Sequence, residues 1–449
     1  MSRDSKPTVT KPIGAHYAEK SKESRTSKTR KPSSGAHYAP ERSWAESIFA
    51  GDKALWVVIV TLLVYSLFVV YSTTAYDPAL NANQELTKQF LFIGIGMAAF
   101  FFVQSFHWMT YRPLIKFVYW ASIILTIIMI VTHTGSNAAR SINIAGFDFQ
   151  PFELLKVSVI LLLADCLARQ QKHIDKIDIL PSLRIKDWKK DPKKQTRTFW
   201  KYTVPILGPI ALACCITIII SNSTTFIIAI SCFLMLFIGR VKSSDIWKII
   251  ILGAVVGSVA LLTFGGRVDT LGGRISGYSP WVLKKSAKVE SDGKEYYVRP
   301  AHELDQTMYA KMSIASGGLQ GKGPGQSTNR YLQEADKDMA YAFLIEEYGL
   351  IVGGVFILLA FLIMFYRGLE IFKKCSTAFP ALAVLGVITA IVLQAFLHMM
   401  VSVSLLPVTG QQLPIVSKGG SSLVFTLASL GLVMGISARA NNGTLNNKN

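Results

Sequence analysis

The residues best suited to chemistry stand at the start of an apolar run near residue 340. The acids there are Glu334, Asp336, Asp338, Glu346 and Glu347. Acidic side chains at the mouth of a membrane helix are costly, so they suggest a function. Asp338, the last acid before the run, could remove a proton from a hydroxyl while a lipid-linked partner is held at the bilayer surface. The alternative is a charge at a helix N-terminus that interacts with the helix dipole, worth about 0.3–1 kcal/mol.

A second candidate is the block of residues 140–156, RSINIAGFDFQPFELLK. Gln150 and Pro151 come before a helical pattern, and proline suits a first helical turn because its missing N–H would be unpaired there. Glu153 and Lys156 have i, i+3 spacing, so they meet on one helix face. A lone charge inside a membrane span costs about 2.5–3.5 kcal/mol. The pair is therefore either an ion pair that fixes helix packing or part of a polar cavity for an amphiphilic ligand.

The glycine-rich run at residues 316–327, SGGLQGKGPGQS, is a weaker candidate. It is not a nucleotide-binding P-loop, because Lys322 is followed by Gly323 where that motif requires Ser or Thr. Closely spaced glycines beside Lys322 could still offer backbone N–H groups to a phosphate. A flexible surface loop is the equal alternative.

Residues 405–422, LLPVTGQQLPIVSKGGSS, cannot form one continuous helix because prolines and glycines interrupt them. Since this segment lies between two apolar runs, we expect a re-entrant or packed loop that lines a cavity. Lys418 is its only basic residue.

The elements that must position these residues are membrane helices. The chain has 449 residues, of which 51% are hydrophobic, and its continuous apolar runs are long enough to cross a hydrocarbon core of roughly 30 Å as helices. We therefore predict an all-α integral membrane protein. It has about ten transmembrane helices, at residues 55–75, 90–106, 114–132, 154–168, 204–220, 226–239, 246–264, 341–366, 381–400 and 421–436.

Lysine and arginine placement predicts the orientation, because short cytoplasmic loops carry an excess of them. Both termini are then cytoplasmic, and residues 265–340 form a long extracytoplasmic loop between helices 7 and 8. The predicted domains are a disordered basic tail at 1–50, a membrane domain at 51–438 and a C-terminal tail at 439–449. The net charge of +19 needs no nucleic-acid partner, since basic inner loops face anionic lipid.

Together, these four blocks resemble the SEDS family (shape, elongation, division and sporulation), which contains the peptidoglycan polymerases FtsW and RodA. The matching stretches are QPFELLK, SGGLQGKGPGQS, the block ending in Asp338 with FLIEEYGLIVGG after it, and LLPVTGQQLPIVSKGGSS. The similarity covers residues 55–438. Lys418 before the Gly-Gly pair, together with the long basic N-terminal tail, looks more like the division branch, FtsW, than like RodA.

The resemblance implies a glycosyltransferase that polymerises lipid II, a disaccharide-peptide on undecaprenyl pyrophosphate, at the outer face of the bacterial cytoplasmic membrane. The essential acid of the family corresponds to Asp338. The acid and lysine of its QPSE-type motif correspond to Glu153 and Lys156, and its loop arginine to Arg140. Gln150, Lys322 and Lys418 complete our set of candidate substrate contacts. Phe152 stands where the family has serine, a departure that affects the finer substrate contacts.

The chemistry asked of these residues is modest, because a pyrophosphate leaving group is already stable as an anion. One general base, Asp338, could activate the acceptor hydroxyl, with positive charge to stabilise the departing phosphates. Lys156, Arg140 or a divalent cation, Mg²⁺ or Mn²⁺, would supply that charge. No metal ligands are identified, and no organic cofactor is expected.

The resemblance also implies a partner, a class B penicillin-binding transpeptidase, and other division proteins at the septum. Two other functions remain open. A lipid II flippase would use the Glu153–Lys156 pair inside a span. A non-catalytic division scaffold would use the pentapeptide GAHYA, which occurs twice in the N-terminal tail and could raise the avidity for a partner.

Overall fold

The structure, a computed structural model, describes residues 49–76, 82–132, 141–144, 147–171, 174, 179–180, 191–263, 287–291, 294–298, 306–327 and 337–441. Contacts within the chain separate residues 1–47 from residues 48–449, so every described residue belongs to the second unit. Most of the predicted tails, Arg140, Glu334, Asp336 and most of the predicted outer loop lie outside the described residues.

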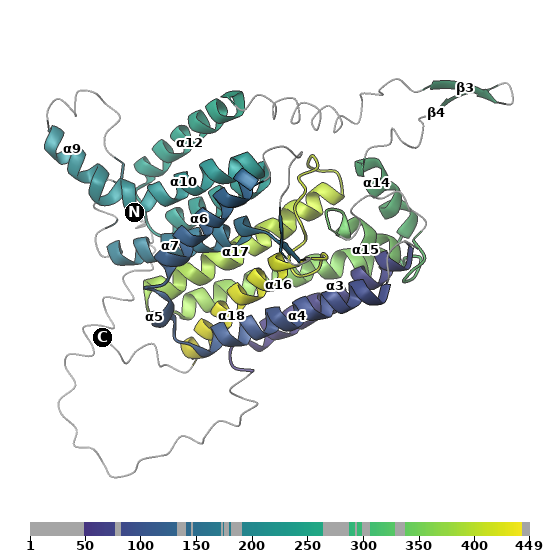
Figure 1. The fold of residues 1–449 in the computed structure, drawn as a ribbon, viewed down its shortest axis with the longest axis horizontal. Coiled ribbons are helices and arrows are strands. Elements are labelled where there is room, and N and C mark those ends of the chain that lie inside the picture. The colour runs from purple at the N-terminus through teal and green to yellow at the C-terminus, as the bar shows by residue number, and fades with distance from the viewer. Residues whose placement is uncertain are drawn as a thin grey trace, which may run out of the picture. The chain divides into compact units, whose positions relative to one another are not determined.

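Helices dominate the described part of the chain (Figure 1). The longer ones are α3 (Lys53–Tyr76), α4 (Ala82–Ser105), α6 (Ile115–Thr132), α7 (Pro151–Gln170), α10 (Val204–Ile220), α11 (Asn222–Ile238), α12 (Ser243–Thr263), α16 (Phe356–Lys374), α17 (Ala378–Ser402) and α18 (Ser421–Asn441). The shorter ones are α5 (Trp108–Tyr111), α9 (Pro192–Thr198), α14 (Gln306–Gly317) and α15 (Ala340–Gly349). Two π-helical turns, η1 (Phe199–Thr203) and η3 (Leu350–Val355), join α9 to α10 and α15 to α16.

The strands form two antiparallel hairpins. In the first, β1 (Ile142–Ile144) pairs with β2 (Phe147–Phe149), with Ile142 opposite Phe149. In the second, β3 (Ala287–Ser291) pairs with β4 (Lys294–Val298). The first hairpin comes directly before α7 and brings Asp148 close to the start of that helix.

Seven helical segments in the described residues are long and apolar enough to cross a membrane, namely Lys53–Thr74, Asn83–Ser105, Ile115–Thr132, Pro192–Ile220, Ala340–Lys374, Ala378–Ser402 and Ser421–Ala440. The all-α multi-pass membrane protein predicted above is therefore confirmed. Nine predicted spans coincide with an α-helix, and the span at 341–366 covers α15, η3 and part of α16. However, α7 carries Glu153, Lys156, Asp165 and Arg169, and α11 is only 17 residues long. The number of crossings and the sidedness of the loops stay predictions.

Helix α17 forms the centre of the bundle. It is apolar around its whole circumference, as expected of a helix with protein on every side, and nearly all of its side chains are buried. It contacts α7, α11, α16 and α18 (Figure 1). Its few polar residues, among them Gln394 and His398, are therefore held inside the protein, where a polar group needs a hydrogen-bond partner.

The predicted span at 341–366 is interrupted by the π-helical turn η3. Gly349, just before η3, has φ of 77° and ψ of 170°, a backbone conformation that is essentially restricted to glycine. A Cβ atom added to Gly353 would stand 2.1 Å from the Leu344 carbonyl oxygen. Only glycine therefore lets the turn pass this close to α15, and a simple helical pattern did not predict the interruption.

The segment between α17 and α18 is irregular, as its prolines and glycines predicted. Leu413, Ile415 and Val416 are buried, so the segment is packed into the protein rather than loose on its surface. Near its C-terminal end, Ser417 bonds to Lys337 and Lys418 pairs with Glu85 of α4.

Candidate active site

A cavity of about 620 Å³ collects most of the predicted site residues. We call it the polar cavity. It is formed by α4, the β1–β2 hairpin, the start of α7, the residues before α15 and the loop between α17 and α18. Its charged lining consists of Glu85, Lys88, Asp148, Glu153, Lys337, Asp338 and Lys418. Gln150 lines it too, so the predicted packed loop and QPFELLK block meet around one space.

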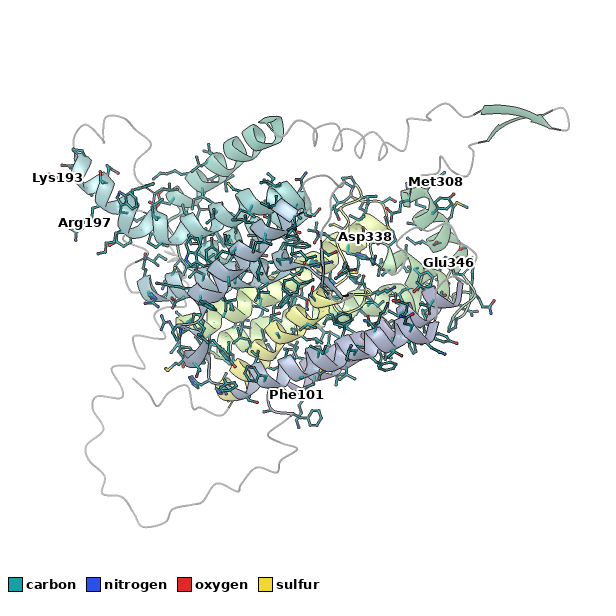
Figure 2. The ribbon with its side chains drawn as sticks, in the orientation of Figure 1. Phe101, Lys193, Arg197, Met308, Asp338 and Glu346 are labelled. Carbon is teal, nitrogen blue, oxygen red and sulfur yellow. The ribbon has the colours of Figure 1, made fainter. Side chains whose placement is uncertain are left out.

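Asp338 is half-buried in the wall of the polar cavity, immediately before α15 (Figure 2). The preceding residue, Lys337, accepts a hydrogen bond on its carbonyl oxygen from Ser417 Oγ at 2.8 Å. The following residue, Met339, is fully buried. The backbone is thus held on both sides of Asp338, and the carboxylate stands at a cavity, as a general base must.

Glu153 and Lys156 form the predicted i, i+3 pair. Pro151 opens α7 with Gln150 at its N-cap. Lys156 Nζ donates to Glu153 Oε2 at 2.6 Å and to Gln394 Oε1 at 2.5 Å. Glu153 reaches the polar cavity, whereas Lys156 does not line it, and both residues are 4% exposed. The pair therefore connects α7 to α17, and Glu153 alone lines the cavity; that this cavity takes an amphiphilic ligand stays a prediction.

Lys418 lines the polar cavity and forms an ion pair with Glu85 of α4. Its Nζ is 3.2 Å from Glu85 Oε2, and Lys88 Nζ is 2.7 Å from Glu85 Oε1. The sequence reasoning missed Glu85, Lys88 and the neighbouring Gln89. A signal was available, because Glu85 and Lys88 repeat the i, i+3 spacing of Glu153 and Lys156 at the start of another apolar run.

Gln412, in the loop after α17, lines the polar cavity, and Gln394 of α17 is hydrogen-bonded to it; both were also missed. Gln394 Nε2 donates to the Gln412 carbonyl oxygen at 3.1 Å. Ser422 Oγ donates to Gln412 Oε1 at 2.8 Å. Because Lys156 also donates to Gln394, these contacts join α7, α17 and α18 behind the polar cavity. The only signal in the sequence was a glutamine inside an apolar helix.

Lys322 lies elsewhere, in a cluster that we call the glycine clasp (residues 316–327 with Glu346 and Glu347). Lys322 Nζ is 2.7 Å from Glu346 Oε1. The backbone N–H groups of Lys322 and Gly323 donate to the carbonyl oxygens of Glu346 and Glu347 at 3.0 and 2.9 Å. The donors that we expected to face a phosphate are thus used within the protein, and this placement does not support a substrate contact for Lys322.

The residues described by the structure do not define a resident metal site. They include no group of three or more His, Cys, Asp and Glu side chains that could hold an ion, and Glu85 and Glu153 already pair with lysines. Mg²⁺ commonly uses only one or two carboxylates together with substrate phosphates. A divalent cation would therefore fit here only in company with a phosphorylated substrate, and Mg²⁺ or Mn²⁺ stays a prediction.

The chain resembles known proteins over most of its length. The family model described as cell cycle protein (FtsW, RodA, SpoVE) matches residues 52–442, so the chain belongs to this family. This confirms the SEDS resemblance. Its relatives include the stage V sporulation protein E of Bacillus subtilis strain 168, which is 29% identical over 399 residues, covering 86% of this chain and 96% of that protein.

Two further relatives carry an enzyme name. The probable peptidoglycan glycosyltransferase FtsW of Bacillus subtilis is 26% identical over 407 residues, covering 86% of this chain and 90% of that protein. The peptidoglycan glycosyltransferase MrdB of Escherichia coli K12 is 26% identical over 394 residues, covering 86% and 93%. Because sporulation, FtsW-type and MrdB-type relatives all match, the FtsW branch stays a prediction.

Solved structures support the fold. A chain of a peptidoglycan synthase complex that coordinates polymerization and crosslinking superposes with a TM-score of 0.57 at 21% identity, covering 87% of this chain and 99% of that chain. The rod shape determining protein RodA of Thermus thermophilus gives a TM-score of 0.53 at 21% identity, covering 87% and 98%.

Proposed function

We propose that this protein is a peptidoglycan glycosyltransferase that polymerises lipid II into glycan strands and releases undecaprenyl pyrophosphate. Family membership and the names of its relatives support this activity. The observation that carries the proposal is that Asp338 shares the polar cavity with Gln150, Glu153 and Lys418. A carboxylate beside lysines in a cavity at a helix mouth suits a reaction between a sugar hydroxyl and a sugar diphosphate.

In the proposed reaction, Asp338 takes the proton from the acceptor hydroxyl of one saccharide. The hydroxyl oxygen forms a bond to the anomeric carbon of the other saccharide, and the bond from that carbon to the diphosphate oxygen breaks. The diphosphate leaves with the bonding electron pair, so no general acid is required for its departure. Lys418 and Lys337, which line the same cavity, would stabilise this anion electrostatically.

The ion-pair geometry refines the role of Lys156. Its ammonium group is occupied by Glu153 and Gln394 and lies behind the cavity wall. It would therefore orient Glu153 toward the substrate rather than contact the diphosphate itself. Arg140, outside the described residues, keeps its proposed role as a phosphate contact.

A polymerisation assay in detergent tests the proposal. Purified protein with lipid II should form glycan strands, and Asp338→Asn should lower the rate by about 10²- to 10⁴-fold, as loss of a general base does. Asp191→Asn, an exposed acid before α9, is the matched control and should retain the rate. Normal polymerisation by a folded Asp338→Asn variant would refute the base assignment.

The same assay separates the polymerase from the flippase. The buried Glu153–Lys156 pair inside a helix is the observation that favours transport of a polar head group. In detergent there are no compartments to cross, so glycan strands can come only from polymerisation. The flippase would be favoured if no preparation consumed lipid II in detergent while the protein moved lipid II across the bilayer of proteoliposomes.

We further propose that the protein works with a cross-linking partner at the division septum. A class B penicillin-binding transpeptidase would cross-link the new strand, at the division septum of the bacterial cytoplasmic membrane, together with other division proteins. The similarity to a chain of a synthase complex that couples polymerization to crosslinking supports such a partner. Labelled protein found along the side wall in place of the septum would favour the elongation branch.

A further inference from the structure

Helix α17 and the loop after it hold the backbone on both sides of Asp338. We propose that His398, a buried residue of α17, is a positioning residue that sets the location of the Asp338 carboxylate. This inference rests on the proposed function, in which Asp338 is the base. His398 is 1% exposed and does not line the polar cavity, so any effect on the reaction passes through other residues.

The two ring nitrogens of His398 have distinct partners. Nε2 accepts a hydrogen bond from the backbone N–H of Tyr341 at 3.3 Å. Nδ1 lies 2.7 Å from the carbonyl oxygen of Gln411. Because Nε2 acts as an acceptor, the ring proton is on Nδ1 and is donated to Gln411. The neutral imidazole thus connects the start of α15 with the loop after α17.

The contact to Tyr341 matters because this amide stands in the first turn of α15. First-turn N–H groups have no carbonyl partner within their own helix. The N-cap residue of α15, Met339, provides no side-chain acceptor, and Tyr341 is buried. A buried N–H without an acceptor costs about 1–3 kcal/mol. His398 therefore caps α15 from outside, three residues after Asp338.

The loop side of the connection is equally fixed. Gln411 Nε2 donates to Ser221 Oγ at 3.2 Å and to Thr224 Oγ1 at 3.1 Å, which ties the loop to α11. Ser417 Oγ, farther along the same loop, bonds the carbonyl oxygen of Lys337. The hydrogen bonds to Lys337 and to Tyr341 therefore hold the backbone before and after Asp338, and both come from α17 and the loop after it. Loss of the His398 bond would free the α15 side while the Ser417 side remains.

Substitutions of graded length test this role. An asparagine amide ends near the position of Nδ1, so His398→Asn keeps a donor for Gln411 but cannot reach Tyr341. A glutamine amide extends to the position of Nε2, so His398→Gln can again accept from Tyr341. We expect His398→Asn to lower kcat by about 10- to 100-fold, since a small displacement of a reacting group has this effect, with little change in KM. His398→Gln should recover most of kcat.

Hydrogen exchange supplies a readout that does not depend on activity. In His398→Asn, the backbone amides of residues 340–344 should exchange at least about 10-fold faster, because their cap is lost. Residues 356–366 of α16 should be unchanged. Thr389→Val, also buried in α17, is the matched control and should alter neither exchange at 340–344 nor kcat.

The outcomes separate this inference from the proposed function. Wild-type kcat in a His398→Asn protein with normal exchange at 340–344 would overturn the positioning role. Equal loss of activity in His398→Asn and His398→Gln would overturn it too, since a purely structural role predicts no rescue. If the wild-type protein forms no glycan, the proposed function fails, whereas faster exchange in His398→Asn alone would still support the connection to α15.

Discussion

The polar cavity and the glycine clasp both contain acids, lysine and glycines close to α15. The clasp bonds its charged groups to one another and to the backbone, whereas the cavity leaves charged groups beside open space. In the clasp, Glu346 and Glu347 are at most 1% exposed, and their oxygens bind Lys322, Ser327 and backbone N–H groups. In the polar cavity, Asp338, Lys337 and Lys418 line about 620 Å³ of space. Figure 2 labels Asp338 beside the loop after α17 and Glu346 nearer to α14. Charge composition alone therefore does not separate a structural cluster from a site; the space left beside the charges does.

The largest effect that distinguishes the two regions is expected at Gly349, whose backbone packs against residues 319–321 of the clasp. Gly349→Ala would place a Cβ atom 2.3 Å from the Leu319 carbonyl oxygen, in a backbone conformation restricted to glycine. Such backbone strain costs about 1–3 kcal/mol before the steric clash is added. We expect a clear fall in the melting temperature of the purified protein. Gly94→Ala in α4, whose Cβ would meet nothing within 4 Å, is the control and should not lower it.

Glu346→Gln should have the next largest effect, also on stability. It removes the charge that Lys322 and Ser327 bind, and hydrogen bonds to charged groups contribute about 1.5–3 kcal/mol. The melting temperature should fall, while kcat of the remaining folded protein should stay near the wild-type value. A loss of kcat at unchanged melting temperature would contradict the division into a structural clasp and a reactive cavity.

The smallest effect compares a lysine from each region. Lys418→Gln should raise KM for lipid II by about 5- to 10-fold, because a half-buried cation that already pairs with Glu85 contributes roughly 1 kcal/mol toward a phosphate. Lys322→Gln should leave KM unchanged and lower the melting temperature instead. Equal KM values for the two variants would show that Lys418 does not contact the diphosphate.

Local spacing predicted the parts of the site that depend on neighbours in the sequence. The Glu153–Lys156 pair, the start of α7 at Pro151 and the break after α17 all follow from geometry within a few residues. The placement of Asp338 at the mouth of a helix could be predicted for the same reason.

Gln394 and His398 were missed because their roles depend on contacts between distant elements. Lys156 and Gln394 are 238 positions apart, and His398 meets Tyr341 across 57 positions. No periodicity in one sequence encodes which helices become neighbours. The structure does not support the role expected for Lys322 for a related reason, because its partner on α15 comes from helix packing rather than from the glycine-rich motif itself.

The glycine clasp has a mechanical consequence. Without side chains at Gly317 and Gly321, the clasp backbone lies directly on the α15 backbone, where added Cβ atoms would stand 2.2 Å from the Ile345 and Glu347 carbonyl oxygens. Two main chains in direct contact leave no compliant layer between them. A displacement of α14 is therefore passed directly to α15, and the start of α15 lies two residues after the proposed base, Asp338.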